Sequence, residues 1–338
     1  MRADACYIIA EAGVNHDGDV DKALQLVDIA ASAGADAVKF QTFSAARLVT
    51  ASAPKAAYQQ RTTEAAESQL AMLSRLELSD EAHRVLQRRA RERGIAFIST
   101  PFDEQACDFL ETLDLPLYKV PSGELTNIPF LRHVAGKKRP MILSTGMASL
   151  GEVERALAVV REAGCDDVTV LHCTSSYPAE MADVNLRAMQ SMATTFGVRV
   201  GYSDHTLGIE VSTAAVALGA RVIEKHFTID KTSPGPDHAA SLEPEELRAL
   251  VRAVRHIEAA LGDGVKRQRP VELEVARVAR KSIVAARDLD VDAVVGAHDV
   301  VMRRPGTGLS SEHLDAVIGR RLRTAVAAGD LLTFSVLA

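Results

Sequence analysis

Two histidines near the centre of the sequence have the surroundings that a metal-assisted enzyme requires. His205 and His226 each follow a short apolar run that predicts a β-strand. Further ionisable residues stand beside them: Asp204, Glu224, Lys225, Asp237 and His238. Neutral imidazole binds divalent metals well, and carboxylates suit hard, oxygen-preferring cations. A hydrogen bond to nearby backbone would explain one such histidine but not this cluster, so we expect His205 and His226 to bind a divalent metal.

Two lysines indicate an anionic substrate at the same place. Lys39 and Lys119 belong to two other apolar runs, and hydroxyls stand at or just after the ends of three runs, at Thr100, Ser122 and Ser144. A lysine supplies a point charge for phosphate or carboxylate, and hydroxyls complete the shell. Buried ion pairs and a Schiff base are the alternatives, but desolvation makes the first a weak reason to bury lysines.

The nearby carboxylates complete a catalytic set. Glu11, Glu124 and Asp237 are candidates for acid–base chemistry. A metal held by two histidines leaves coordination positions for substrate or water, and it could polarise a carbonyl oxygen. The residues therefore predict an anionic, phosphorylated substrate that meets a carbonyl group, with carbon–carbon bond formation or phosphate release as the reaction.

The elements that must position these residues alternate between strand and helix. Eight short apolar runs predict strands at 7–10, 37–40, 96–99, 117–120, 141–144, 168–171, 199–202 and 221–224. Helical spacing of apolar residues lies between them, as at 20–33, 79–93, 150–163 and 209–218. Eight such units predict a (β/α)8 TIM barrel, with the site at the C-terminal ends of the strands. An open doubly wound sheet is the alternative, but no glycine-rich dinucleotide loop follows the first strand.

The pattern changes after Gly262. We expect a catalytic barrel domain at 1–262, a charged linker with Pro270 at 263–279, and a small second domain at 280–338 with strand-like runs at 282–285 and 331–334. A domain of this size is near the lower limit for a self-sufficient core. It should therefore lean on the barrel or on a partner chain.

Composition argues against nucleic acid or a membrane as a partner and against secretion. The chain has 338 residues and a net charge of −6, which gives no reason to expect nucleic acid or a membrane as partner. The N-terminal residues lack a signal-peptide pattern, and the four cysteines show no metal or disulfide spacing. We expect a cytoplasmic protein with reduced thiols, in which Cys173 is a small buried apolar residue rather than a nucleophile.

The motifs together resemble the sialic acid synthase family. The segments that carry the resemblance are AEAGVNH (10–16), VKFQT (38–42), STPF (99–102), YKVPSGE (118–124), LSTGM (143–147), LHCT (171–174), SDHT (203–206), EKHF (224–227) and GPDH (235–238). The C-terminal part, from RPGTG (304–308) to Gly329-Asp330, resembles the family's antifreeze-like domain, of the SAF or β-clip type. The resemblance covers essentially the whole chain.

The resemblance implies condensation of phosphoenolpyruvate with N-acetylmannosamine and water, giving N-acetylneuraminate and phosphate. His205 and His226 would hold Mn²⁺, with Mg²⁺ or Co²⁺ as alternatives. Phosphoenolpyruvate would contact Lys39, Thr100, Lys119, Ser122, Ser144 and Ser203. The amino sugar would contact Gln41, Glu124, Tyr177 and Asp237, and Glu11 would lie near the metal and water. Arg304 would enter the barrel of the other subunit in a domain-swapped homodimer.

Some alternatives stay open at this point. Ser175 and Ser176 stand where some family members carry asparagine or an acidic residue, and Ser175 is a further substrate-binding candidate. The acceptor could instead be a 2,4-diacetamido-2,4,6-trideoxy hexose, giving legionaminate or pseudaminate. A synthase of seven- or eight-carbon acids would need an extra basic cluster for a phosphorylated sugar. A non-catalytic sugar-binding or polysaccharide-assembly protein would have lost catalytic residues, and none is lost. We favour an orienting role for Asp204 and a loop role for His238.

Overall fold

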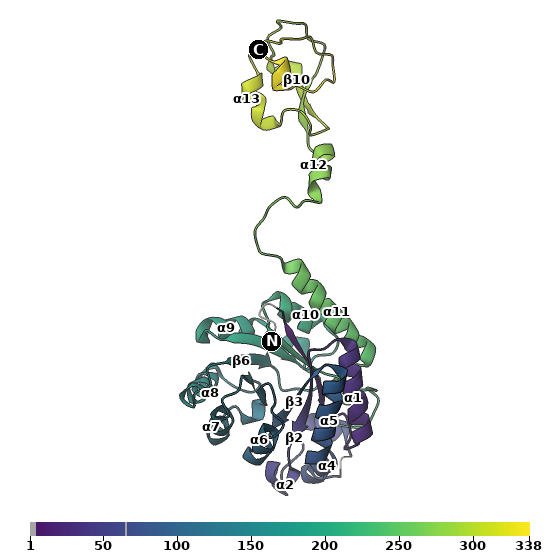
Figure 1. Cartoon of the computed structure of the whole chain (residues 1–338), viewed down its shortest axis with the longest axis vertical. Coiled ribbons are helices and arrows are strands. Elements are labelled where there is room, and N and C mark those ends of the chain that lie inside the picture. Colours follow the sequence, from purple (N-terminus) through teal and green to yellow (C-terminus); the bar gives the residue numbers. More distant parts are fainter. Residues whose placement is uncertain (1–4, 65) are drawn as a thin grey trace. The chain divides into compact units, whose positions relative to one another are not determined.

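The chain folds into two compact units, which are described separately. The computed structural model describes residues 5–64 and 66–338. The first unit is Met1–Gly262 and the second is Asp263–Ala338 (Figure 1). No helix in the described part of the chain is long and apolar enough to cross a membrane.

The first unit is a parallel barrel. Its strands are β1 Tyr7–Gly13, β2 Ala37–Thr42, β3 Ala96–Pro101, β4 Tyr118–Val120, β5 Met141–Ser144, β6 Val168–Cys173, β7 Arg199–Asp204 and β8 Val222–His226. They are hydrogen bonded in the order β3-β2-β1-β8-β7-β6-β5-β4, and the two end strands, β3 and β4, contact each other. The near-closed ring confirms the predicted TIM barrel, and every predicted strand is present.

Helices surround this ring (Figure 1). The principal ones are α1 Val20–Ala33, α5 Asp80–Arg93, α6 Glu104–Glu111, α7 Ile128–Gly136, α8 Leu150–Glu162, α9 Arg187–Phe196, α10 Glu210–Ala217 and α11 Pro244–Leu261. Three short helices, α2 Ala45–Leu48, α3 Ala57–Thr62 and α4 Gln69–Arg75, lie between β2 and α5. Single 3-10 turns follow three strands, at Ser122–Glu124, Met181–Asp183 and His238–Ala240.

Local sequence signals set the ends of the helices. The carboxylate of Asp19 accepts hydrogen bonds from the first turn of α1, and the Ser79 hydroxyl does the same for α5. Gly34 and Gly94 end these helices in the left-handed conformation, at φ of 81° and 71°. These N-caps and C-caps confirm the ends predicted for both helices.

Side chains inside the barrel lie in layers because successive residues of a strand point to opposite faces. The lowest layer is an apolar cluster of Ile9, Ala37, Ile98, Leu117, Ile142, Leu171 and Val222. Two residues further along each of these strands come Glu11, Lys39, Thr100, Lys119, Ser144, Cys173 and Glu224, and Ser203 takes the same place on β7. A polar layer therefore rests directly on an apolar one.

The intervening residues point outward and include a buried ion pair. Lys225 on β8 and Asp204 on β7 are fully buried, with 3.0 Å between Lys225 Nζ and Asp204 Oδ2. Asp204 also accepts hydrogen bonds from the Thr206 backbone, the Thr206 hydroxyl and the Ser212 hydroxyl of α10. The pair thus joins the ends of β7 and β8 to α10, behind the histidines that follow each strand.

The second unit has its own small core. Helix α12 Glu272–Ala279 precedes β9 Ser282–Ala285, which pairs antiparallel with β10 Val300–Arg303, and α13 Leu314–Val317 follows. Apolar side chains such as Ile283, Val295 and Leu332 are buried together. Helix α12 forms the second half of the segment expected as a linker at 263–279. One expectation differs from the structure: the strand expected at 331–334 is reduced to one bridge between Leu331 and Val284, followed by a 3-10 turn at Phe334–Val336.

We predict that Lys225→Met destabilises the barrel by about 3–5 kcal/mol, because it leaves the Asp204 carboxylate buried without a counter-charge. Urea unfolding followed by circular dichroism measures the change. The matched control is Glu245→Ala in the exposed pair with Arg248 on α11, where we expect at most about 1 kcal/mol. Equal small losses in both variants would contradict a structural role for the buried pair.

Candidate active site

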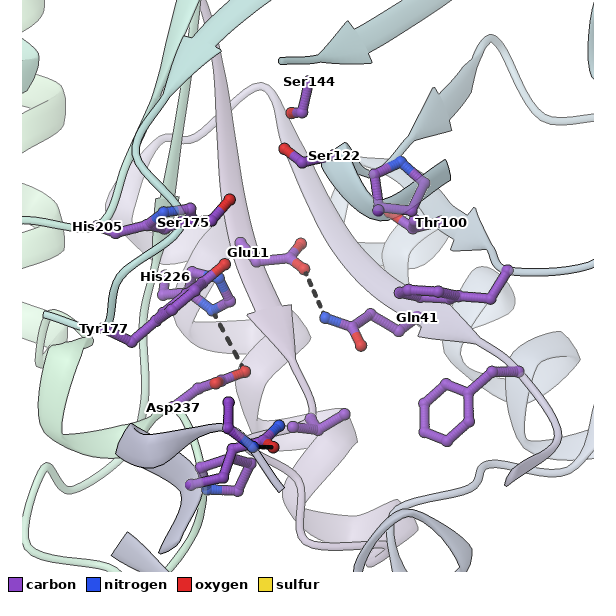
Figure 2. Close-up of a pocket in the computed structure, with 18 of the residues that line it drawn as sticks. Glu11, Gln41, Thr100, Ser122, Ser144, Ser175, Tyr177, His205, His226 and Asp237 are labelled. Atoms are coloured by element: carbon purple, nitrogen blue, oxygen red, sulfur yellow. Dashed lines mark hydrogen bonds and ion pairs between the residues drawn. The ribbon is translucent and has the colours of Figure 1, made fainter. Parts of the chain in front are cut away.

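The polar layer forms the floor of a cavity at the C-terminal end of the barrel. The cavity has a volume of about 490 Å³. It brings together thirteen of the residues proposed from the sequence: Glu11, Lys39, Gln41, Thr100, Lys119, Ser122, Ser144, Ser175, Tyr177, Ser203, His205, His226 and Asp237 (Figure 2). These residues come from all eight strands or the loops that follow them, so only the closed barrel assembles them.

An ion network of two lysines and two carboxylates occupies the floor. Glu224 lies between the lysines, with its carboxylate oxygens 3.2 Å from Lys119 Nζ and 3.6 Å from Lys39 Nζ. Lys39 also pairs with Glu11 at 2.8 Å and donates a hydrogen bond of 2.9 Å to Thr100. All four charged side chains are buried. Lys39 therefore pairs with both carboxylates and Glu224 pairs with both lysines, which distinguishes the network from simple ion pairs.

The two carboxyl groups have opposite acidities. Burial alone raises the pKa of both, but Lys119 and Lys39 together hold the pKa of Glu224 well below its usual value. For Glu11, burial outweighs the attraction of Lys39, and the negative charge of Glu224 adds to it, so the pKa of Glu11 is raised. Two carboxyls whose environments separate their pKa values are suited to different roles. Glu224 remains ionised, and Glu11 can exchange a proton.

Hydroxyl groups surround the two lysines on the floor. The Ser203 hydroxyl donates to Glu224 at 2.8 Å, and the Ser122 hydroxyl accepts a hydrogen bond from the Gly146 backbone at 2.9 Å. The buried Ser144 hydroxyl has no hydrogen-bond partner among the described residues. Buried polar groups are normally satisfied, so an unpartnered one in a cavity is suited to a ligand.

His205 and His226 lie above this floor, as the next inward-facing residues after Ser203 and Glu224. Their ring centroids are 5.6 Å apart. Burial lowers the pKa of both imidazoles, so both are neutral near pH 7. His205 Nδ1 lies 2.7 Å from the Thr174 carbonyl oxygen, to which a neutral ring donates, leaving Nε2 as a free acceptor. His226 Nδ1 is buried without a hydrogen-bond partner in the described chain.

This pair fits a divalent cation with incomplete protein coordination. In the described residues no three histidine, cysteine or acidic side chains are grouped to bind a metal. Two neutral imidazoles with available nitrogens therefore supply two ligands, and the remainder would come from substrate or water, as in open catalytic sites.

Asp237 reaches the cavity from the loop after β8, which contacts the loop after β1. Its carboxylate lies 3.9 Å from His226 Nδ1 (Figure 2), and burial raises the pKa of Asp237 to about 6. Asn15 donates to the Ser241 hydroxyl at 2.9 Å, and that hydroxyl donates to the Asp237 carbonyl at 2.7 Å. His238 bridges Asp17 of the loop after β1 and Thr228 of the loop after β8. His238 thus stabilises loops, whereas Asn15 helps to position Asp237.

One residue proposed from the sequence, Glu124, does not line the cavity, and another, Arg304, belongs to the second unit. Glu124 ends a 3-10 turn, and its carboxylate accepts a hydrogen bond from Asn127 at 2.7 Å. The inward alternation of β4 runs through Leu117, Lys119 and Pro121, and the turn breaks it before Glu124. Glu124 therefore does not line the cavity in this structure, and its contact with the amino sugar stays a prediction. Arg304 is exposed in the second unit, where its Nε donates to the Ala279 carbonyl at 2.9 Å.

The structure also places in the cavity residues to which the sequence argument assigned no role in the site. Glu224 is central to the floor, and its signal was its spacing of two from His226 along one strand. Cys173 lies 3.2 Å from the Ser122 hydroxyl, and burial raises the pKa of its thiol, as expected for a residue that is not a nucleophile. Tyr58, from α3, lines the cavity as well. No periodic pattern connects Tyr58 to the barrel strands.

The fold and the site define a class: a parallel barrel enzyme with a buried cationic floor beneath two histidines. Family models agree, since the NeuB family model matches residues 26–266 and the SAF domain model matches residues 280–338. The chain belongs to the NeuB family and carries a SAF domain. It is an enzyme of the phosphoenolpyruvate-dependent sugar-acid synthase type, which confirms the family and the enzyme class expected from the sequence.

Individual relatives match along nearly the whole chain. The chain is 49% identical over 331 residues to N,N'-diacetyllegionaminic acid synthase of Legionella pneumophila, covering 97% of this chain and 93% of the relative. The synthase of the same name from Campylobacter jejuni is 49% identical over 315 residues, covering 93% and 94%. The solved N-acetylneuraminic acid synthetase of Leptospira borgpetersenii has a TM-score of 0.71 at 35% identity, covering 80% of this chain and 90% of that one.

We predict that Gly13→Ala disturbs the site selectively. Gly13 has φ of +54°, and an added Cβ would lie 3.2 Å from the His226 ring. The control is Gly94→Ala, with φ of +71° and nothing within 4 Å of the added atom. Each should lose about 1–2 kcal/mol in thermal unfolding, the cost of left-handed backbone. Only Gly13→Ala should also lose synthase activity, by roughly 10- to 100-fold through displacement of His226. Equal activity in the two variants would contradict this.

Proposed function

We propose that this protein condenses phosphoenolpyruvate with the aldehyde of an open-chain 2,4-diacetamido-2,4,6-trideoxy hexose and water, giving a legionaminate-type nine-carbon acid and phosphate. The observation that carries the proposal is the floor of Lys39 and Lys119, bridged by Glu224 and ringed by hydroxyls, directly beneath His205 and His226. N-Acetylmannosamine, the acceptor first expected from the sequence, is the second candidate.

The floor suits phosphoenolpyruvate in charge and in hydrogen bonding. Lys39 and Lys119 are the only basic residues with long side chains among the described residues that line the cavity. They can pair with the phosphate and carboxylate of the donor, while Thr100, Ser122, Ser144 and Ser203 offer hydroxyls. Because Glu11 ionises less readily than Glu224, the two lysines face less than two full negative charges, which favours an anionic ligand.

The wall of the cavity supports the acceptor. Apolar side chains from the β1 and β3 loops and the segment after β2 line one side: Val14, Phe43, Leu48, Met72, Leu73, Leu76 and Phe102. A second acetamido group and a C6 methyl can contact such a wall, where N-acetylmannosamine would place hydroxyls. A sugar phosphate would need further cations, and none of the described lining residues supplies them. The 49% identity to two diacetyllegionaminic acid synthases favours the same acceptor.

The reaction requires one new carbon–carbon bond and one net proton movement. C3 of phosphoenolpyruvate bonds to the aldehyde carbon, whose oxygen takes a proton. Water adds at C2 and gives up a proton, and the C2–O bond then breaks to release phosphate. Asp237, whose pKa is raised to about 6, is the candidate to protonate the sugar oxygen, and Glu11 is the candidate to accept the proton from water. The barrel's largest contribution is to hold the two reactants in register.

A divalent cation bound by His205 and His226, Mn²⁺ first, with Mg²⁺ and Co²⁺ as alternatives, would polarise the aldehyde carbonyl as a Lewis acid. The histidines lie one layer above the lysines, so the acceptor aldehyde would lie above the donor. Gln41, Ser175 and Tyr177 line the same upper level and can contact the acceptor.

Phosphate release from phosphoenolpyruvate tests the proposal. We predict release by the full chain with Mn²⁺ and the diacetamido sugar, and none after EDTA treatment. The kcat/KM should exceed that for N-acetylmannosamine by roughly 10- to 200-fold, the discrimination available from one or two apolar groups. N-Acetylmannosamine 6-phosphate is the control acceptor and should react least. Preference for the phosphorylated sugar would reject the acceptor, and metal-independent release would reject the role of the histidines.

We further propose a homodimer in which Arg304 of one chain completes the barrel site of the other. Arg304 is exposed, and its guanidinium is not part of an ion pair with another described residue, so it is available to an anionic ligand. In such a dimer, the role of the small SAF domain would be to supply Arg304 to the active site of the other chain.

Mixed dimers test this arrangement. We predict that Arg304→Ala and Asp237→Asn are each nearly inactive alone, and that co-expression restores about a quarter of wild-type activity, since half the dimers would each contain one intact site of two. The exposed neighbour Arg303→Ala should behave as wild type. Mixtures no more active than the separate variants would contradict sharing between chains.

A further inference from the structure

Tyr177 lies in a stack of three rings at the edge of the cavity. One face of its ring packs on His205, with centroids 4.1 Å apart and planes at 32°. Tyr58 from α3 also stacks on Tyr177, with centroids 4.9 Å apart and planes at 29°. His226 meets the Tyr177 ring edge-on at 5.7 Å and 82°. The hydroxyl end of Tyr177 points into the cavity (Figure 2). The ring positions therefore decide where this hydroxyl lies.

The His205 side of the stack is fixed by the barrel. His205 Nδ1 binds the Thr174 carbonyl at 2.7 Å, and the His205 carbonyl accepts from the Ala179 backbone at 2.9 Å. These bonds hold both ends of the loop that carries Tyr177. Tyr58 comes from outside this arrangement, 119 positions earlier in the sequence.

Helix α3 contributes to the cavity rather than to the apolar core. None of its residues is buried, so it adds little to the apolar core. The ends of its segment are joined by the buried Lys55, whose ammonium donates to the Thr63 hydroxyl at 3.0 Å and to the Glu64 carbonyl at 2.5 Å. Thr62 accepts a backbone hydrogen bond from Gly235 at 3.3 Å, two residues before Asp237. The segment thus joins the Tyr177 loop and the Asp237 loop.

We propose that Tyr58 is a positioning residue for the acceptor sugar, acting through the ring of Tyr177. The inference rests on the proposed function. Tyr58 covers the outer side of the stack, so that Tyr177 keeps its hydroxyl toward the acceptor level. The donor level is independent of it, because Lys39, Lys119 and their hydroxyls lie on strands or directly after them. Tyr58 should therefore affect the acceptor and not phosphoenolpyruvate.

Kinetics of three variants test this role. We expect Tyr58→Ala and Tyr58→Leu to raise the acceptor KM roughly 3- to 10-fold, the range that aromatic pairs contribute, with the phosphoenolpyruvate KM within about twofold of wild type. Tyr58→Phe keeps the ring and should restore the acceptor KM. Calorimetric titration with phosphoenolpyruvate alone should give equal affinity in all variants. A rise in both KM values would indicate general damage, and a Tyr58→Phe variant as poor as Tyr58→Ala would place the function in the hydroxyl. Either result overturns the inference.

A spectroscopic measurement tests the stack without turnover. The chain has no tryptophan and five tyrosines, so its near-ultraviolet circular dichroism is dominated by tyrosine. Tyr58→Phe and Tyr177→Phe should each remove the same coupled signal, and Tyr7→Phe should not. A double variant whose signal loss equals the sum of the two single losses would show that the rings are not coupled and overturn the inference. If the wild-type protein turns over no acceptor, both the proposed function and the acceptor role of Tyr58 are rejected. If the wild-type protein is active and Tyr58→Ala leaves the acceptor KM unchanged, only this inference is rejected.

Discussion

The site depends on keeping two lysines charged in a place from which water is largely excluded. Lys39 and Lys119 are each 3% exposed, and an isolated ammonium at such depth would tend to lose its proton. Glu224 opposes this, because it lies within 3.6 Å of both nitrogens: burial still lowers the pKa of Lys119, whereas Glu11 and Glu224 together raise the pKa of Lys39. One carboxylate cannot neutralise both cations, and the second carboxyl, Glu11, ionises less readily. The floor is therefore left with unsatisfied positive charge, which a phosphate or carboxylate can relieve.

The sequence predicts much of this arrangement, because the two-residue alternation of a β-strand places both the core and the site residues. The apolar runs locate the eight strands. The residue two positions after each apolar residue of the lower layer faces the same side and forms the polar floor. Ile9 leads to Glu11, Leu117 to Lys119, and Val222 to Glu224 and then His226. The sequence contains this regularity wherever the strand continues. It fails at Glu124, where a 3-10 turn replaces the strand and carries the carboxylate out of the cavity.

The features that could not be predicted depend on contacts between distant segments. Tyr58 is recognisable only because α3 is brought to the loop after β6, and neither segment has a periodic apolar pattern. The second unit shows the same limit on a smaller scale. Its run at 331–334 has strand-like composition, but only Leu331 finds a partner, at Val284, so a single bridge forms. Composition gives the strand propensity of these residues, but a strand forms only where a neighbouring segment is available to pair with it.

The apolar layer at the base of the barrel has a kinetic consequence. Ile9, Leu117, Ile142 and Val222 close the barrel below the lysines, so the floor communicates with solvent only through the mouth. Any ligand on the floor must pass the level of the histidines both on entry and on exit. An acceptor at that level would stand between the donor and solvent. If the donor occupies the floor, as proposed, the topology of the barrel favours entry of the donor before the acceptor.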